Sequence, residues 1–86
     1  MKKVLIAEDE ASIREFIVIN LKRSGYDVVE AENGEEAINK YEEENGNIDV
    51  AVLDIRMAPK NGLEVCKELR AKSSKIGVIM LTAKAQ

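Results

Sequence analysis

The apolar residues of this chain recur in two patterns that alternate along it. Continuous apolar runs are typical of buried strands, whereas apolar residues at every third or fourth position are typical of one helix face. The strand-like segments are residues 4–7, 26–31, 48–53 and 76–81. The helix-like segments are residues 12–24, 35–45 and 62–72. The pattern therefore predicts a strand and a helix three times over, followed by a fourth strand.

Turn and capping residues indicate where the helices begin and end. Gly25 favours the left-handed conformation that stops the first helix, Asn33-Gly34 marks the entry to the second, and Asn61 is a good N-cap for the third. The apolar faces that we predict for the three helices are Ile13, Phe16, Ile17, Asn20, Leu21 and Ser24; Ala37, Ile38 and Tyr41; and Leu63, Cys66 and Leu69. Cys66 is thus expected to be structural.

The alternation of strands and helices predicts an α/β fold with a parallel sheet. Parallel strands need crossover connections, and right-handed crossovers place helices on both faces of the sheet. We predict the strand order 2-1-3-4, in which the first and third strands are neighbours. The sequence contains no sign of a linker, a domain boundary or an internal repeat, so we expect a single domain over residues 1–86.

Composition narrows the class of protein. The 86 residues include 13 basic and 16 acidic side chains, and the net charge of −3 argues against direct nucleic-acid binding. Aromatic residues make up 3% of the chain, which is too few for a base-stacking surface. No segment reaches membrane-spanning length, and a single cysteine suits a reducing compartment. We therefore expect no membrane association and a cytoplasmic location.

Acidic and hydroxyl side chains follow the ends of the predicted strands. Glu8, Asp9 and Glu10 come after the first strand, Asp54 ends the third, and Thr82 ends the fourth. Ligands of open α/β sheets bind at the carboxyl ends of the strands, so the acids of the first and third strands should converge. Converging carboxylates repel one another, and a hard divalent cation such as Mg²⁺ relieves that repulsion. For each acid alone, a solvated strand end is the alternative.

Four segments of the chain resemble a known family. "VLIAEDE", "VAVLDIRM" and "VIMLTAK" resemble, in order and in spacing, the signature of the receiver domain of two-component response regulators. The segment "GYDVVEAENGEEAI" also resembles that family's second strand and helix. The resemblance extends over the whole chain and implies a flavodoxin-like, three-layer α/β fold.

The resemblance also implies a phosphoacceptor with its metal site. Asp54 would accept a phosphoryl group from a histidine kinase or a small phosphodonor. Asp9, Asp54 and the backbone carbonyl of Arg56 would bind Mg²⁺ or Mn²⁺, and Glu8 would act through a bound water. The Thr82 hydroxyl would hydrogen-bond the phosphoryl oxygen. The implied function is phosphorelay signal transduction, without an enzymatic activity of its own.

Two alternatives stay open at this point. The first is a structural or interaction module, or a designed receiver fragment, that keeps the acidic residues but no longer performs phosphotransfer. The second is an autonomous aspartate-dependent phosphatase, which requires a second Asp two residues after the nucleophile. Arg56 occupies that position here, so the phosphatase is disfavoured.

The chain departs from the family pattern in two places. The family's loop after the phosphoacceptor has Pro four residues on, whereas this chain has Ala58 there and Pro59 one position later, so we expect an altered loop path. A complete receiver continues through another helix, a fifth strand and a final helix, whereas this sequence ends at Gln86. That further part carries the family's Lys, which pairs with the phosphoryl group, so we expect impaired phosphorylation.

The fourth strand is interior in a complete receiver, and without a fifth strand it would be an edge. An uncharged edge strand without Pro offers unpaired backbone groups to a second chain. Two copies that pair about a two-fold axis would cover each other's edge. We therefore expect a homodimer through the edge of this strand, at Ile76, Val78 and Met80.

Overall fold

Seven strands and helices follow one another in the order that the sequence predicts. The structure is a computed structural model, and it describes residues 2–81. The elements are β1 (Lys3–Ala7), α1 (Ala11–Arg23), β2 (Asp27–Ala31), α2 (Gly34–Glu43), β3 (Val50–Asp54), α3 (Gly62–Lys72) and β4 (Gly77–Leu81). Their ends differ from the predicted ones by one or two residues at most. Among these described helices, none is both long and apolar enough to cross a membrane.

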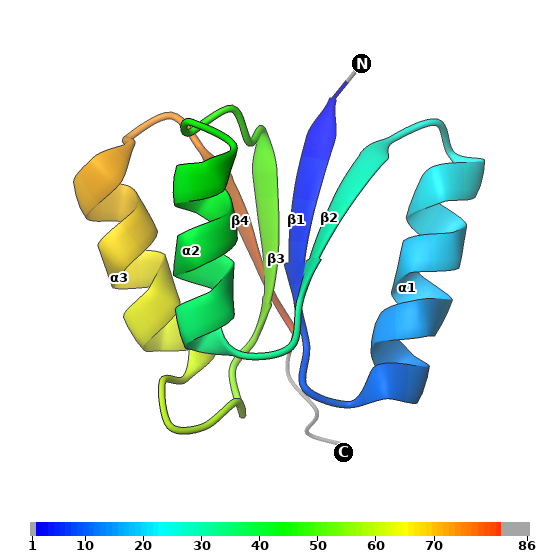
Figure 1. The fold of residues 1–86 in the computed structure, drawn as a ribbon, viewed down its shortest axis with the longest axis horizontal. Helices are drawn as coiled ribbons and strands as arrows, with labels where there is room; N and C mark the ends of the chain where they lie inside the picture. Colours follow the sequence, from blue (N-terminus) through cyan, green and yellow to red (C-terminus); the bar gives the residue numbers. More distant parts are fainter. Residues whose placement is uncertain (1, 82–86) are drawn as a thin grey trace.

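The four strands form one parallel sheet in the predicted order, β2-β1-β3-β4. β1 pairs with β2 on one side and with β3 on the other, so that Leu5 lies opposite both Val29 and Ala51. Figure 1 shows α1 on one face of the sheet and α2 and α3 on the other face. The predicted three-layer arrangement is therefore confirmed. The central strands β1 and β3 run side by side between the two layers of helices.

Alternate residues of β1 pack into two separate cores. Leu5 and Ala7 belong to the larger cluster, which lies between the sheet and the helices α2 and α3. Val4 and Ile6 belong to the smaller cluster, which contains Val18 of α1. A strand segment that is covered on both faces has no position for a polar side chain, which explains why residues 4–7 of β1 form a continuous apolar run.

Side-chain caps fix where α2 and α3 begin. The Asn33 side chain accepts a hydrogen bond from the backbone N–H of Glu36 at 2.7 Å. Asn61 accepts from the N–H of Glu64 at 2.9 Å, and the Glu64 carboxylate accepts from the N–H of Asn61 at the same distance. This reciprocal capping box satisfies two backbone donors at the start of α3. The predicted N-cap role of Asn61 is confirmed, and so is the left-handed stop at Gly25, whose φ is +92°.

The predicted apolar face of α1 is wrong in part. Val18 is the buried residue of this helix, and Ile17 and Leu21 are partly buried beside it. Ile13 and Phe16 are 41% and 69% exposed instead. Apolar residues surround much of this helix, so more than one face satisfies the helical period. Packing of α1 against β1 and β2 selects the face that contains Val18.

The predicted face of α3 needs a similar correction, whereas that of α2 is confirmed. Val65 and Leu69 are fully buried, and Cys66 is partly buried against the same cluster. Leu63, which the sequence pattern places on the buried face, is 53% exposed. The step of four residues between Val65 and Leu69 therefore defines the buried face of α3.

Candidate functional site

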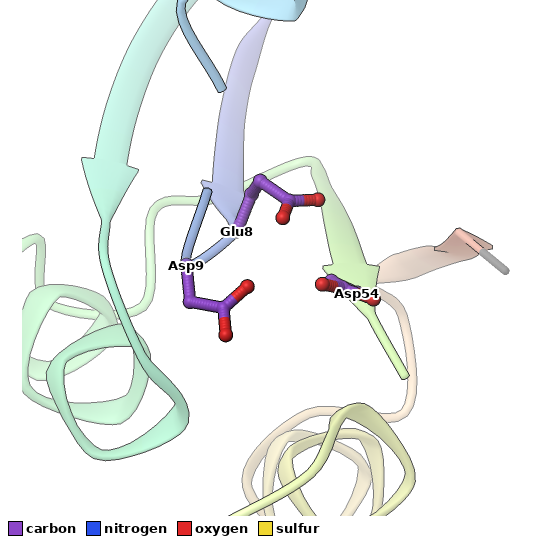
Figure 2. Close-up of side chains that lie close together, drawn as sticks. All are labelled: Glu8, Asp9 and Asp54. Carbon is purple, nitrogen blue, oxygen red and sulfur yellow. The ribbon is translucent and has the colours of Figure 1, made fainter. Parts of the chain in front are cut away.

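Three carboxylates meet where β1 and β3 end. Glu8 and Asp9 follow β1 directly, and Asp54 is the last residue of β3. Each contributes one carboxylate oxygen to a set whose members all lie within 4.8 Å of one another. In Figure 2 the three side chains point into the space between the two strand ends. The parallel pairing of β1 with β3 thus produces the predicted convergence, and we call Glu8, Asp9 and Asp54 the acidic cluster.

The members of the acidic cluster differ in exposure. Glu8 and Asp54 are only 4% and 5% exposed, whereas Asp9 lies at the surface. Burying a carboxylate is costly unless a partner compensates its charge. Within residues 2–81, no ion pair joins a Lys or Arg side chain to any of the three acids. Among residues 2–81, the charge of the cluster is therefore not neutralised by an ion pair.

Glu8 titrates far from the ordinary range of a glutamate. Burial, helped by the neighbouring Asp54 carboxylate, raises its pKa to about 7, although a hydrogen bond from the Glu10 N–H to Glu8 Oε2 at 3.1 Å opposes the rise. A proton on Glu8 removes one of the repelling charges. A cation in the cluster would remove the same repulsion, so proton and metal compete for this position.

The backbone after Asp54 folds tightly around this residue. The N–H of Arg56 donates a hydrogen bond to Asp54 Oδ1 at 3.0 Å. Gly62, the first residue of α3, approaches Asp54 so closely that a Cβ there would lie 2.5 Å from the Asp54 carbonyl oxygen. That position accepts only a residue without a Cβ unless the backbone shifts. The β3–α3 loop (residues 55–61) is therefore compact. Its Arg56 N–H holds the side chain of Asp54, and the start of α3 packs against the backbone carbonyl of Asp54.

The acidic cluster lines a cleft of about 380 Å³. One wall of the cleft is apolar and consists of Ile13 and Ile17 of α1 together with Leu81 of β4. The sequence pattern assigns both isoleucines to the core and Leu81 to a buried strand, so sequence reasoning misses this wall. A usable signal exists, because the two isoleucines stand four residues apart and the first of them lies three positions after Glu10, the last residue of the acidic run.

The roles predicted for Arg56 and Thr82 stay predictions. Arg56 lines the cleft, and the hydrogen bond that it makes to Asp54 comes from its backbone N–H. A metal-binding role for its carbonyl stays a prediction. Thr82, the predicted hydrogen-bond donor to the phosphoryl group, lies outside the described residues.

The donor atoms of the cluster fit a hard divalent cation. Mg²⁺ takes oxygen ligands and usually keeps several waters, with one or two carboxylates from the protein. The acidic cluster supplies oxygen atoms alone, and the whole chain contains no histidine. The exposed position of Asp9 leaves one side of the cluster open to water. These features suit Mg²⁺ or Mn²⁺ better than a metal that prefers nitrogen or sulfur ligands.

Fold and site together define a class of protein. Open parallel sheets bind ligands outside the carboxyl ends of the strands, at the point where the strand order reverses. In this chain that point lies between β1 and β3, and the acidic cluster occupies it. The molecule is therefore a flavodoxin-like α/β domain with an acidic site at its topological switch point.

The chain belongs to the response regulator receiver domain family, whose profile matches residues 4–86. Among its relatives in Bacillus subtilis (strain 168), the alkaline phosphatase synthesis transcriptional regulatory protein PhoP is 47% identical over 83 residues. The transcriptional regulatory protein ResD from the same organism is 44% identical over 84 residues. The two alignments cover 96% and 98% of this chain but 34% of each relative. The chain thus spans about a third of the length of these curated relatives.

Solved structures agree with this assignment. The response regulator protein TrrA from Thermotoga maritima in complex with Mg²⁺-BeF has a TM-score of 0.90 and 44% identity, over 99% of this chain and 72% of that chain. TrrA in complex with the histidine kinase ThkA has a TM-score of 0.88 and 43% identity, over 100% of this chain and 72% of that chain. The resemblance inferred from the sequence motifs is confirmed.

Proposed function

We propose that this chain is a phosphoacceptor in a two-component phosphorelay, with Asp54 as the residue that receives the phosphoryl group. Asp9, Asp54 and the backbone carbonyl of Arg56 would hold Mg²⁺ or Mn²⁺, and Glu8 would act through a bound water. The observation that carries the proposal is the approach of three carboxylates to within 4.8 Å at the ends of β1 and β3. We include Thr82 as a phosphoryl hydrogen-bond donor on the strength of the sequence motif alone.

The arrangement suits transfer of a phosphoryl group to a carboxylate. An oxygen of Asp54 forms a bond to phosphorus while the donor's bond to phosphorus breaks, and the leaving group departs with the electron pair. A bound divalent cation neutralises part of the charge of the two anions that must approach each other. The chain's own contribution is placement, because Gly62 and the Arg56 N–H hold Asp54 in one position.

Two of the similar structures support the partner and the cofactor. TrrA was solved with a histidine kinase and with Mg²⁺-BeF, so we propose a histidine kinase as donor and Mg²⁺ as cofactor for this chain as well.

The same role has further parts. We propose that this chain has no enzymatic activity of its own and that it is located in the cytoplasm. The net charge of −3 supports the absence of direct nucleic-acid binding by this chain. We also propose that residues 1–86 form a single domain.

Phosphoryl transfer can be measured with acetyl phosphate as a small donor. We expect the protein to gain the mass of one phosphoryl group in the presence of Mg²⁺, and to gain none when a chelator removes the metal. Asp54→Asn should abolish the gain because the nucleophile is lost. Asp27→Asn is the matched control, since Asp27 is an exposed acid that begins β2 at the opposite end of the sheet.

Intact-mass measurement separates the outcomes of this experiment. Modification that persists in Asp54→Asn would identify a different acceptor. Failure of the wild type to react with Mg²⁺ present, while it still binds the metal, would favour the alternative of an interaction module without phosphotransfer.

We further propose that the polypeptide of these 86 residues pairs with a second copy through the outer edge of β4. Within residues 2–81, β4 pairs with β3 alone, and Ile79 on β4 is 55% exposed. Of the three predicted contact residues, Ile76 is removed from the proposed interface, because it is 3% exposed and belongs to the larger core cluster. Val78 and Met80 are partly buried against that same cluster.

A further inference from the structure

Arg14, in the first turn of α1, contacts residues of two other segments of the fold, which its position in the sequence does not predict. Its side chain is 13% exposed, although arginine usually lies at the surface. Nη1 donates a hydrogen bond of 2.7 Å to the backbone carbonyl oxygen of Glu8. Nε lies 3.4 Å from Oε1 of Glu30 in β2. One guanidinium therefore joins three elements: α1, the end of β1 and β2.

The contact with Glu8 bears directly on the acidic cluster. The Glu8 carbonyl belongs to the peptide group that connects Glu8 to Asp9, so whatever holds this oxygen also sets where the Asp9 side chain begins. The backbone N–H of Glu8 donates to the Ala31 carbonyl at 3.1 Å. The end of β1 is thus held to the end of β2 twice, once by backbone and once through Arg14 and Glu30.

The guanidinium of Arg14 pairs with a carboxylate outside the acidic cluster. In the part of the chain that the structure describes, the ion pair of Arg14 is with Glu30, and no ion pair joins Arg14 to a member of the acidic cluster. A guanidinium paired with those carboxylates would neutralise the charge that attracts a cation. Bound to the backbone carbonyl instead, Arg14 orders the loop without forming an ion pair with these carboxylates.

We infer that Arg14 is a positioning residue for the acidic cluster: it clamps the loop of residues 8–10 to β2 and so holds Asp9 in place for the cation. This inference rests on the proposed function in that the ligand is the divalent cation proposed above. The guanidinium is suited to the role because its planar fork carries several donors in fixed directions. A lysine has one ammonium group on a flexible chain and cannot reproduce both contacts with the same geometry.

The experiment compares Arg14→Met, Arg14→Lys and, as the matched control, Arg23→Met, which removes an exposed arginine from the last turn of the same helix. The first measurement is amide hydrogen exchange without metal. We expect the Glu10 amide, which donates to Glu8, to exchange several-fold faster in both Arg14 variants and at the wild-type rate in the control. Unchanged exchange of buried core amides such as Leu53 verifies that the variants are folded.

The second measurement is titration with Mg²⁺ alone. Groups that orient a metal ligand typically contribute about tenfold or more to affinity, so we expect Kd to rise by about that factor in Arg14→Met and by less in Arg14→Lys. A purely electrostatic role gives the opposite sign, because removal of a positive charge strengthens binding of a cation in Arg14→Met and leaves Arg14→Lys unchanged.

The two measurements keep the inference separate from the proposed function. Wild-type exchange at Glu10 in Arg14→Met, or an unchanged or lowered Kd with faster exchange, overturns the inference. Absence of Mg²⁺ binding by the wild type overturns the proposed metal site, and the metal-free exchange rates then decide by themselves whether Arg14 clamps the loop.

Discussion

Glu8 and Asp54 illustrate how burial can prepare a carboxylate for binding. Both are almost fully buried, their charges repel, and within residues 2–81 no basic side chain pairs with either. The free-energy cost of this arrangement falls when a proton binds to Glu8, which is why the pKa of Glu8 rises to about 7. A divalent cation lowers the same cost. The repulsion therefore favours ligand binding over the empty state.

The raised pKa of Glu8 predicts a pH dependence of stability. Between the ordinary pKa of 4.5 and the folded-state pKa of about 7, the folded protein retains a proton that the unfolded chain has lost. The metal-free protein should therefore lose stability as the pH rises through this window, by roughly 1–3 kcal/mol between about pH 5 and about pH 8. Denaturant unfolding in the presence of a chelator measures this difference.

Glu8→Gln is the control for this pH dependence, because glutamine keeps the shape of the side chain and cannot titrate. The chain contains no histidine, so few other groups titrate near neutral pH. The variant should have a flatter stability profile than the wild type. Equal slopes in the two proteins would contradict a Glu8 carboxyl that holds its proton near neutrality.

The acidic cluster itself could be predicted from the sequence, whereas its supports could not. Glu8, Asp9 and Asp54 follow from one fact that the sequence contains, namely that each stands at or just after the end of an apolar run. They follow also from one prediction, the strand order in which these two strands are neighbours, which the structure confirms. Arg14 could not be assigned in this way. Its role depends on the path of the loop after β1, and local hydrogen bonds rather than hydrophobic periodicity determine that path.

At the level of elements, the start of α3 packs closely against the end of β3, next to the site. A Cβ on Gly62 would lie 2.5 Å from the Asp54 carbonyl oxygen and 2.9 Å from the Asp54 carbonyl carbon. The capping box of Asn61 and Glu64 fixes the same end of α3. A shift of α3 would therefore also move the backbone of Asp54, the proposed nucleophile.

We predict that Gly62→Ala both destabilises the fold and weakens Mg²⁺ binding, because the new methyl group must displace α3 or the backbone of Asp54. Overpacking of this kind costs about 1–3 kcal/mol. Gly77→Ala is the matched control, since a Cβ there meets its nearest atoms at 3.5 Å, an ordinary contact distance. It should stay within about 0.5 kcal/mol of the wild type.

Denaturant unfolding and Mg²⁺ titration of the two alanine variants test this connection. If Gly62→Ala matched Gly77→Ala in both measurements, α3 would be able to shift without disturbing Asp54. Loss of stability with unchanged metal affinity would limit the contact to a role in folding.

The helices also show where hydrophobic periodicity is informative. The face of α2 is predictable because its apolar stripe is narrow, and Ala37 and Tyr41 are buried as expected. In α1 the apolar residues are too numerous for the period to select one face. Contacts with β1 and β2 choose Val18 there and leave Phe16 exposed, and those contacts are tertiary. Element order and type are therefore local properties of this sequence, whereas the orientation of α1 is not.

For the whole molecule, β4 is the part of the described fold with the fewest partners. Gly77 donates its N–H to Asp49, and Leu81 accepts from Ile55, so both direct backbone groups toward the β3 side. Because alternate residues of a parallel strand face opposite sides, Val78 and Met80 direct theirs outward. Within residues 2–81 no strand pairs with that outer edge. A small domain has little stability with which to tolerate an open, uncharged edge.

We therefore predict that the 86-residue polypeptide is a dimer at micromolar concentration, as measured by sedimentation. Ile79→Lys should give a monomer, because a lysine on an edge strand opposes pairing with a second strand. Leu63→Lys is the matched control, since Leu63 on α3 is 53% exposed and Ile79 is 55% exposed. It should remain a dimer.

Val78 is less suitable as a test position, because it packs against the core and a charge there would also disturb folding. A monomeric wild type, or a dimer that survives Ile79→Lys, would show that the edge of β4 does not hold two copies together.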